Sequence, residues 1–245
     1  MSLSPISNRI GIGVESYVIF EGDGEDGEGD LYAGSASGGT AYQLTFSRAH
    51  ESSPALSPDG AVLAFIRGRT RQDSSSYRVW IMNLLNGSER ELPALPANAH
   101  LERLAWSADS RTLYLRTSAG DVSTPAPPAG PALLPVPAES SAVADSALEV
   151  MLGESRQARL IPCAGEAGIC VAVDSGAPQN ISTQGAGAFR WGSDSVAFWL
   201  GDAIEIRPLG GGTTRTLRWK GLPAHPGAAT HFRGRPEEVT PPAYR

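Results

Sequence analysis

The sequence has few cysteines, almost no lysine and no long apolar run. Of its 245 residues only Cys163 and Cys170 are cysteines, and Lys220 is the single lysine, so that nearly all positive charge is arginine. The net charge of −6 leaves no basic footprint of the kind that binds nucleic acids. No apolar run approaches the roughly 18–20 residues of a membrane-spanning helix. These absences argue against a nucleic-acid partner and against a transmembrane segment.

Short motifs that mark common enzyme sites are also missing. The sequence contains no His-Glu-x-x-His pair, no Gly-x-Ser-x-Gly elbow and no Walker-type phosphate loop. The four histidines, His50, His100, His225 and His231, fall in predicted loops and near the C-terminal end. A solvated loop histidine is expected there rather than a ligand or a base. We therefore predict no catalytic residue, no cofactor and no metal site.

What the sequence does contain is a recurring turn centred on aspartate. It occurs at residues 57–60, 107–110 and 192–195, and a short, strongly apolar run follows each copy. Runs of this kind, bounded by turn residues, are typical of inner strands covered on both faces. Asp59, Asp109 and Asp194 are predicted to be structural turn residues that accept local hydrogen bonds.

A strand, a glycine-containing hairpin turn and another strand precede each aspartate turn. Copies begin at residues 30, 79 and 170, and a half copy at 204–217 has no aspartate turn after it. This is the pattern of the outer half of a four-stranded antiparallel unit. Because one such unit cannot bury its apolar faces alone, repeated units are expected to stack on one another.

The first copy carries the clearest pattern. It reads Asp30-Leu31-Tyr32, Gly38-Gly39, Leu44-Thr45, Pro54, Ser57-Pro58-Asp59-Gly60 and Leu63-Ala64-Phe65. This pattern resembles the repeat of the TolB-like, WD40-like β-propeller family. The resemblance covers most of the chain and weakens between residues 120 and 152. It implies an all-β fold, a β-propeller of about five four-stranded blades, with six blades as the alternative.

The repeats also predict how the chain is divided. Units near 28–68, 77–117, 119–153 and 157–200 give four blades, of which the third is degenerate. The half copy at 203–219 lacks inner strands, and residues 9–20 contain two strands without partners. We expect the N- and C-terminal strands to close the ring, with residues 17–20 pairing beside residues 204–206, because closure removes open sheet edges.

Residues 1–220 are thus predicted to form the propeller, and residues 221–245 a Pro/Arg-rich extension without strand periodicity. Phe232, Arg233, Arg235 and Tyr244 are candidate partner-binding residues, since aromatic and arginine side chains often anchor interfaces. The alternative is an unstructured, solubilising tail.

Two other features leave alternatives open. Residues 22–30 contain five acids and four glycines, which favours a solvated acidic loop over a Ca²⁺ loop because the ligand order of an EF-hand is absent. Cys163 and Cys170 flank a short hairpin that can place them at bridging distance. Two reduced thiols are favoured for a cytosolic chain.

Together these features predict a non-catalytic scaffold or accessory subunit in a multi-subunit assembly. The resemblance implies a protein partner, because TolB-like propellers commonly dock proteins, some of them membrane-associated. The alternatives are a TolB-like periplasmic binding propeller, a propeller enzyme that binds a small ligand or metal, and a detached peptidase propeller. A cytoplasmic location is the default because Arg9 and Glu15 interrupt any secretory apolar region, and a periplasmic location is the alternative.

Overall fold

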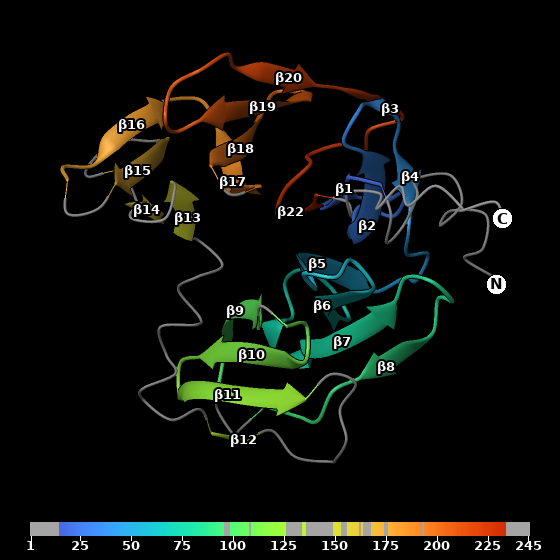
Figure 1. Cartoon of the computed structure of the whole chain (residues 1–245). Helices are drawn as coiled ribbons and strands as arrows, with labels where there is room; N and C mark the ends of the chain where they lie inside the picture. The colour runs from blue at the N-terminus through green and yellow to red at the C-terminus, as the bar shows by residue number, and fades with distance from the viewer. Residues whose placement is uncertain are drawn as a thin grey trace, which may run out of the picture.

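The computed structural model describes residues 15–95, 99–107, 109–125, 134–135, 149–152, 156–161, 163, 168–173, 176–192 and 194–233. This part of the chain consists of β-strands and one 3-10 turn, η1 (Ser74–Ser76), without an α-helix (Figure 1). Among the described residues, no helix is long and apolar enough to cross a membrane.

Five four-stranded antiparallel sheets follow one another around a common centre, as in a β-propeller (Figure 1). The first sheet contains β22 (Ala229–Phe232), β1 (Tyr17–Asp23), β2 (Gly29–Ser35) and β4 (Tyr42–Gln43). The second contains β5 (His50–Leu56), β6 (Val62–Gly68), β7 (Arg78–Asn83) and β8 (Glu89–Glu91). The third contains β9 (Leu101–Trp106), β10 (Thr112–Thr117), β11 (Gly120–Pro125) and β12 (Leu134–Pro135).

The fourth sheet contains β13 (Glu149–Leu152), β14 (Arg156–Ile161), β15 (Ile169–Val173) and β16 (Gln179–Ser182). The fifth contains β17 (Ala186–Trp191), β18 (Ser195–Leu200), β19 (Ala203–Pro208) and β20 (Arg215–Leu217). The predicted all-β fold and its propeller arrangement are confirmed. The count of five or six blades in a closed ring stays a prediction.

The strands are grouped differently from the predicted repeats. β2 pairs with β1 before it, and β5, which precedes the first aspartate turn, opens the second sheet. The predicted units at 28–68 and 77–117 therefore each straddle two sheets. The reason is that a short hairpin joins antiparallel neighbours at little cost in chain entropy, so each strand pairs with the one next to it in sequence.

The two ends of the described chain meet in the first sheet, but not through the predicted strands. On one side of β1 lies β2, and on the other lies β22, with Tyr17 opposite Phe232. β19, which contains residues 204–206, pairs instead with β18 and β20. The predicted pairing of residues 17–20 with 204–206 is wrong, because the turn at 201–202 already gives β19 a hairpin partner. The predicted strand at residues 9–14 lies outside the described residues.

Residues 215–232 cross the seam between the fifth and first sheets. After β20, the strand β21 (Trp219–Lys220) pairs in parallel with β3 (Gly39–Thr40), and β22 then joins β1. The prediction of an extension without strands is wrong for residues 229–232. The domain boundary at residue 220 stays a prediction.

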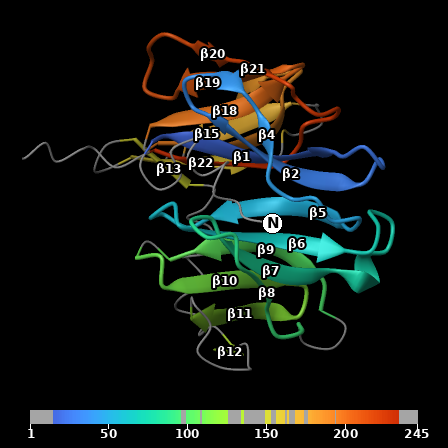
Figure 2. The same ribbon diagram turned by 90° about the vertical axis from the view of Figure 1, so that its right-hand side faces the viewer.

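Apolar side chains fill the seams between neighbouring sheets. At the seam of the fifth and first sheets the Phe20 ring lies between Trp199 and Trp219, with centroids 5.2 and 5.5 Å away. A second cluster, which includes Leu31 and Phe65, joins the first and second sheets, and a third joins the second and third. The sheets thus stack face to face (Figure 2). The loops that connect the strands lie at the two ends of the sheets.

Candidate functional site

Antiparallel order places the loops of the sheets on two opposite faces. One face carries the β1–β2 and β6–β7 hairpins and the connecting residues 44–49, 92–95 and 99–100, and we call it the hairpin face (Figure 2). The other carries the aspartate turns and the β7–β8 turn. A binding site built from loops therefore has two candidate faces.

The predicted turn residues lie on the face opposite the hairpin face. The Asp59 carboxylate accepts hydrogen bonds from the Ser57 hydroxyl, at 2.6 Å, and from the Ala61 N–H, at 3.1 Å. The same two bonds recur around Asp109, and Asp194 accepts one from the hydroxyl of the next residue. Their contribution to stability stays a prediction.

The acidic hairpin at residues 24–28 is tied to two other segments. Arg71 Nη2 lies 2.5 Å from Asp23 Oδ1, and its backbone N–H donates to Glu28. His225 Nδ1 lies 2.8 Å from Asp23 Oδ2. These contacts, with His225 first and Arg71 second, lower the pKa of Asp23. Within the described residues no group of three acids, histidines or cysteines is placed to hold a metal ion.

One histidine is buried and a second is partly buried, so neither is a solvated loop residue. His50 lies in β5, where its Nδ1 accepts a hydrogen bond from the Gly29 N–H at 3.0 Å, and burial lowers its pKa. His231 in β22 stacks on Trp191 with ring centroids 3.8 Å apart, and burial lowers its pKa to about 4. The prediction of solvated loop histidines is wrong for both. Each lies on a strand that the sequence pattern did not indicate.

Beneath the hairpin face lies a buried carboxyl pair that sequence reasoning missed. Asp30 is 5% exposed and Glu51 0% exposed. Gln43 donates to Asp30 Oδ2 at 2.8 Å, and Arg67 Nε donates to Glu51 Oε1 at 2.7 Å. Burial, followed by the charge of Glu51, raises the pKa of Asp30 to about 7. The two residues belong to different sheets, so no local pattern reveals the pair.

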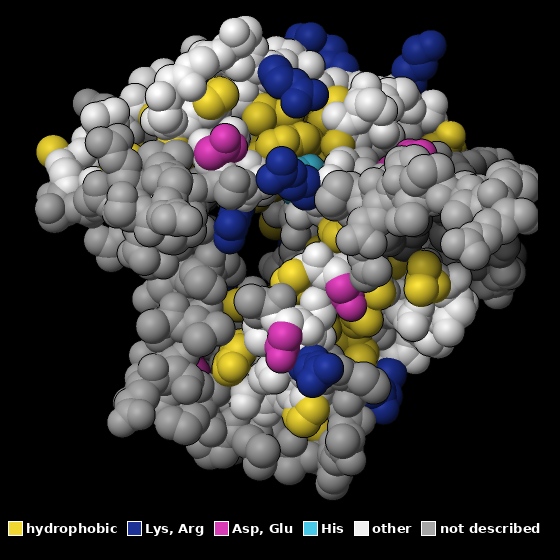
Figure 3. Space-filling view, in the orientation of Figure 1, with side chains coloured by type: hydrophobic (Ala, Val, Ile, Leu, Met, Phe, Trp, Pro, Cys, Tyr) yellow, Lys and Arg dark blue, Asp and Glu magenta, His cyan; other side chains and the backbone are white. Residues whose placement is uncertain are grey.

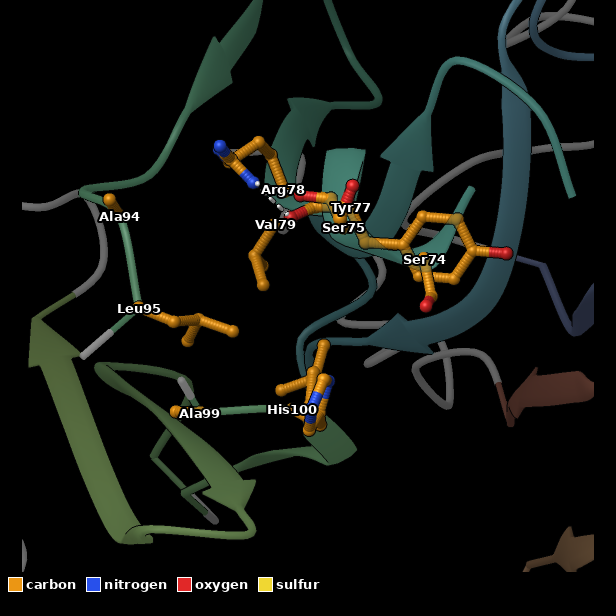
Figure 4. A pocket seen from close by; sticks show the side chains of 10 residues that line it. Ser74, Ser75, Tyr77, Arg78, Val79, Ala94, Leu95, Ala99 and His100 are labelled. Carbon is orange, nitrogen blue, oxygen red and sulfur yellow. Dashed lines mark hydrogen bonds between the residues drawn. The ribbon is translucent and has the colours of Figure 1, made fainter. Parts of the chain in front are cut away.

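A groove opens between the second and third sheets on the hairpin face (Figure 4). Its volume is about 430 Å³. The lining residues are Ser74, Ser75, Tyr77, Arg78, Val79, Ala94, Leu95, Ala99, His100 and Leu101. In Figure 4 the side chains of Val79 and Leu95 point into the same space, and Arg78 and His100 lie at its margins. The groove is an apolar concavity that carries basic side chains and no acid.

Of the four predicted partner-binding residues, the structure describes Phe232 and Arg233. Phe232 is 6% exposed, and its ring centroid lies 5.2 Å from that of Tyr17. Phe232 is therefore part of the core in this structure, and its role in partner binding stays a prediction. Arg233 is exposed. Arg235 and Tyr244 lie outside the described residues.

The two cysteines form a disulfide. Cys163 and Cys170 are bonded, with Cα atoms 5.2 Å apart, and the β14–β15 hairpin places Ile161 opposite Cys170. The prediction of two reduced thiols is wrong, since it rested on the assumed compartment and the hairpin geometry permits the bond.

On the face turned to the viewer in Figure 1, the charged side chains do not form a patch of one sign. There the Lys/Arg and Asp/Glu side chains are interspersed among apolar ones rather than gathered by sign (Figure 3). We therefore take the groove as the candidate site.

The ring of four-stranded sheets defines a β-propeller protein. Among solved structures the chain is similar to TolB from Acinetobacter baumannii, with a TM-score of 0.47 and 12% identity over 89% of this chain and 57% of that one. It is also similar to the β-propeller domain of the Trilobed protease from Pyrococcus furiosus, with a TM-score of 0.34 and 13% identity over 82% of this chain and 66% of that one.

A third similar structure is the tricorn protease, with a TM-score of 0.42 and 16% identity over 81% of this chain and 22% of that one. The chain spans little more than half the length of the Acinetobacter protein. No family model matches the sequence, and no curated protein does. Because the identities are this low, function is argued from the residues themselves.

Proposed function

We propose that the chain is a non-catalytic β-propeller subunit that binds a protein partner in the groove between its second and third sheets. The observation that carries this proposal is the lining of the groove. Val79, Leu95 and Leu101 supply an apolar floor, and the 430 Å³ volume suits one or two partner side chains. Concave apolar sites with a few polar groups at the margin are the usual form of a binding pocket.

The charge of the lining indicates the chemistry of the partner segment. The whole chain has a net charge of −6, yet none of the ten lining residues is an acid, and Arg78 and His100 are among them. The partner segment is therefore an extended peptide with an apolar side chain next to a carboxylate. The apolar side chain fills the groove, and the carboxylate faces Arg78.

The ionisable groups beside the acidic hairpin favour binding over catalysis. Arg71 and His225 both contact Asp23, and His50 accepts a hydrogen bond from the Gly29 N–H. A general base must reach a proton of the substrate, and these contacts leave His50 and Asp23 engaged within the fold.

The disulfide favours the periplasmic alternative over the cytoplasmic default. Disulfides persist in oxidising compartments and are rare in the cytosol. The Cys163–Cys170 bond thus supports a TolB-like binding propeller in the periplasm as the cellular setting. The subunit role within a larger assembly is part of the same proposal.

A pair of peptides tests the proposal. Two fluorescein-labelled peptides differ only in whether a central leucine is flanked by glutamates or by lysines, and fluorescence anisotropy measures their binding to the full chain. We expect the glutamate peptide to bind about tenfold more tightly, as a charge contact at an interface margin gives. Arg78→Glu should reverse this preference.

Arg218→Glu is the matched control, because Arg218 is an exposed arginine outside the groove lining. It should leave the preference unchanged. If neither peptide binds, or if Arg78→Glu leaves the preference as it was, the proposed function fails.

A further inference from the structure

Asp30 and Glu51 meet where the first sheet packs against the second. Asp30 lies on β2 and Glu51 on β5, and one oxygen of each carboxyl group is well satisfied. The other oxygens, Asp30 Oδ1 and Glu51 Oε2, are buried, and neither has a hydrogen-bond donor among the described residues. Two orphaned acceptors at one seam are unusual, because buried polar atoms are almost always paired.

We propose that Asp30 and Glu51 form a proton-binding site, in which one proton held between Asp30 Oδ1 and Glu51 Oε2 joins the first and second sheets. A carboxylic acid has a donor that a carboxylate lacks, so one proton satisfies both orphaned oxygens at once. The proton also neutralises one of two carboxylates, and keeping both of them charged side by side in a buried place costs much free energy.

The neighbours decide which carboxyl group keeps the proton. Arg67 donates to Glu51 Oε1 and also holds Glu89, while the Ser47 hydroxyl donates to Glu51 at 2.5 Å. Glu51 thus has a cation and a hydroxyl donor on one of its oxygens. Asp30 has no cationic partner in its contacts, and burial together with the Glu51 charge raises its pKa. The proton therefore resides on Asp30 and is donated to Glu51.

Within the described residues, charged groups on several neighbouring elements act on the pair or on the side chains beside it. Asp26 on the β1–β2 hairpin adds a negative charge that also raises the pKa of Asp30. His50, next to Glu51, feels the charges of both Glu51 and Glu28, and Tyr32 on β2 feels that of Asp30. Arg67 on β6 and Glu89 on β8 complete the set. Among these charged groups Arg67 is the cation that pairs with Glu51, and Glu89 shares it.

A metal ion fits the same place less well than a proton. Divalent cations such as Ca²⁺ take six or more oxygen ligands. No group of three acids, histidines or cysteines suited to a metal exists among the described residues. Arg67 already compensates Glu51, so a cation there would be repelled by the guanidinium at close range.

Carbon-13 NMR of the carboxyl groups in the full chain tests the site directly. In wild type the Asp30 carboxyl signal should titrate near neutral pH, and the Glu51 signal should move with it. In Asp30→Asn, whose amide mimics the protonated acid, the Glu51 signal should no longer change in the neutral range, because Asp30 is the group that titrates there. Glu51→Gln serves as a second variant, in which the Asp30 transition should move toward its ordinary range.

Urea unfolding at several pH values supplies an independent readout. The folded chain holds a proton that the unfolded chain releases, so the unfolding constant of wild type should rise about tenfold per pH unit between about pH 5 and 7, relative to Asp30→Asn. Asp202→Asn is the control, because Asp202 is exposed and makes only a 4.0 Å contact with Arg218. It should keep the wild-type slope.

Three results would overturn the proposal. One is an Asp30 signal that titrates in the ordinary acidic range. Another is an Asp30→Asn chain with the wild-type pH slope. The third is stabilisation by Ca²⁺ that wild type shows and Asp30→Asn lacks, which would assign the site to a cation.

Discussion

Tyr17 and Phe232 face each other across the antiparallel ladder that joins the two ends of the described chain. Their ring centroids are 5.2 Å apart, and the Tyr17 hydroxyl donates to the Gly60 carbonyl at 2.6 Å. The aspartate turn of the second sheet thus contacts β1 of the first sheet and lies close to the Phe232 ring in β22. β22 is therefore part of the core, and Gly60 lies where the turn packs against it.

Phe232→Ala should lower the free energy of unfolding by about 3–5 kcal/mol, because removing a buried aromatic ring leaves a cavity. Urea unfolding followed by circular dichroism measures this. Phe46 is 67% exposed, so Phe46→Ala should cost less than about 0.5 kcal/mol. Equal stabilities for the two variants would contradict the placement of β22.

Gly60→Ala tests the turn against the same ring. Gly60 has a φ of 73°, and a Cβ there would lie 2.8 Å from the Phe232 ring. Gly192 in the fifth-sheet turn has a φ of 65° and open space around it. Gly192→Ala should cost about 1 kcal/mol from backbone strain alone, and Gly60→Ala about 2–4 kcal/mol from strain and overpacking.

The aspartate of the same turn contributes through hydrogen bonds. Asp59→Ala should destabilise the chain by about 1–2 kcal/mol, because the Ser57 hydroxyl and the Ala61 N–H lose their acceptor. Peptide binding should be retained, since the turn lies on the face opposite the groove. Lost binding at unchanged stability would assign Asp59 to a functional site.

Titration of His231 should act on stability with the opposite sign to that of Asp30. Its folded pKa of about 4 lies below the ordinary value of 6.5, so between these pH values the unfolded chain takes up a proton that the folded chain refuses. Stability from this residue is present above about pH 6.5 and is lost as the pH falls. His231→Phe keeps a ring against Trp191 and should flatten this dependence. A variant with the wild-type acid sensitivity would show that His231 is not the source.

The disulfide should be intact without added oxidant. Iodoacetamide should label no thiol in the unreduced, unfolded chain and two after reduction, as mass spectrometry would count. Reduction should cost about 2–3 kcal/mol, the loop-closure entropy of a short loop. Labelling of both thiols before reduction would contradict the bond.

Local patterns in the sequence predicted most strands and the aspartate turns, because these depend on neighbours in the chain. Leu63, Phe65 and Phe198 lie in apolar runs between turn residues, and all three are fully buried. The pairing of strands was harder to predict. The segment Ala-Thr-His-Phe at 229–232 has no clear alternation, and only the open edge of β1 makes it a strand.

The candidate site was not predictable from the sequence for a related reason. Val79 and Leu95 line one groove only because the second and third sheets pack side by side. Asp30 and Glu51 likewise meet across a seam. Contacts of this kind follow from how the sheets are arranged. The repeat units predicted from the sequence each combine strands of two neighbouring sheets, so they do not show which residues meet between sheets.

The most direct test of the account is to map where the glutamate-flanked leucine peptide binds on the full chain by heteronuclear NMR. We predict that the amide signals which shift belong to residues 74–79, 94–95 and 99–101, around the groove. Leu85 is exposed on the opposite face, so it and its neighbours at 84–88 should not respond. Shifts gathered at 84–88 or at the aspartate turns, or no shifts at all, would contradict the account.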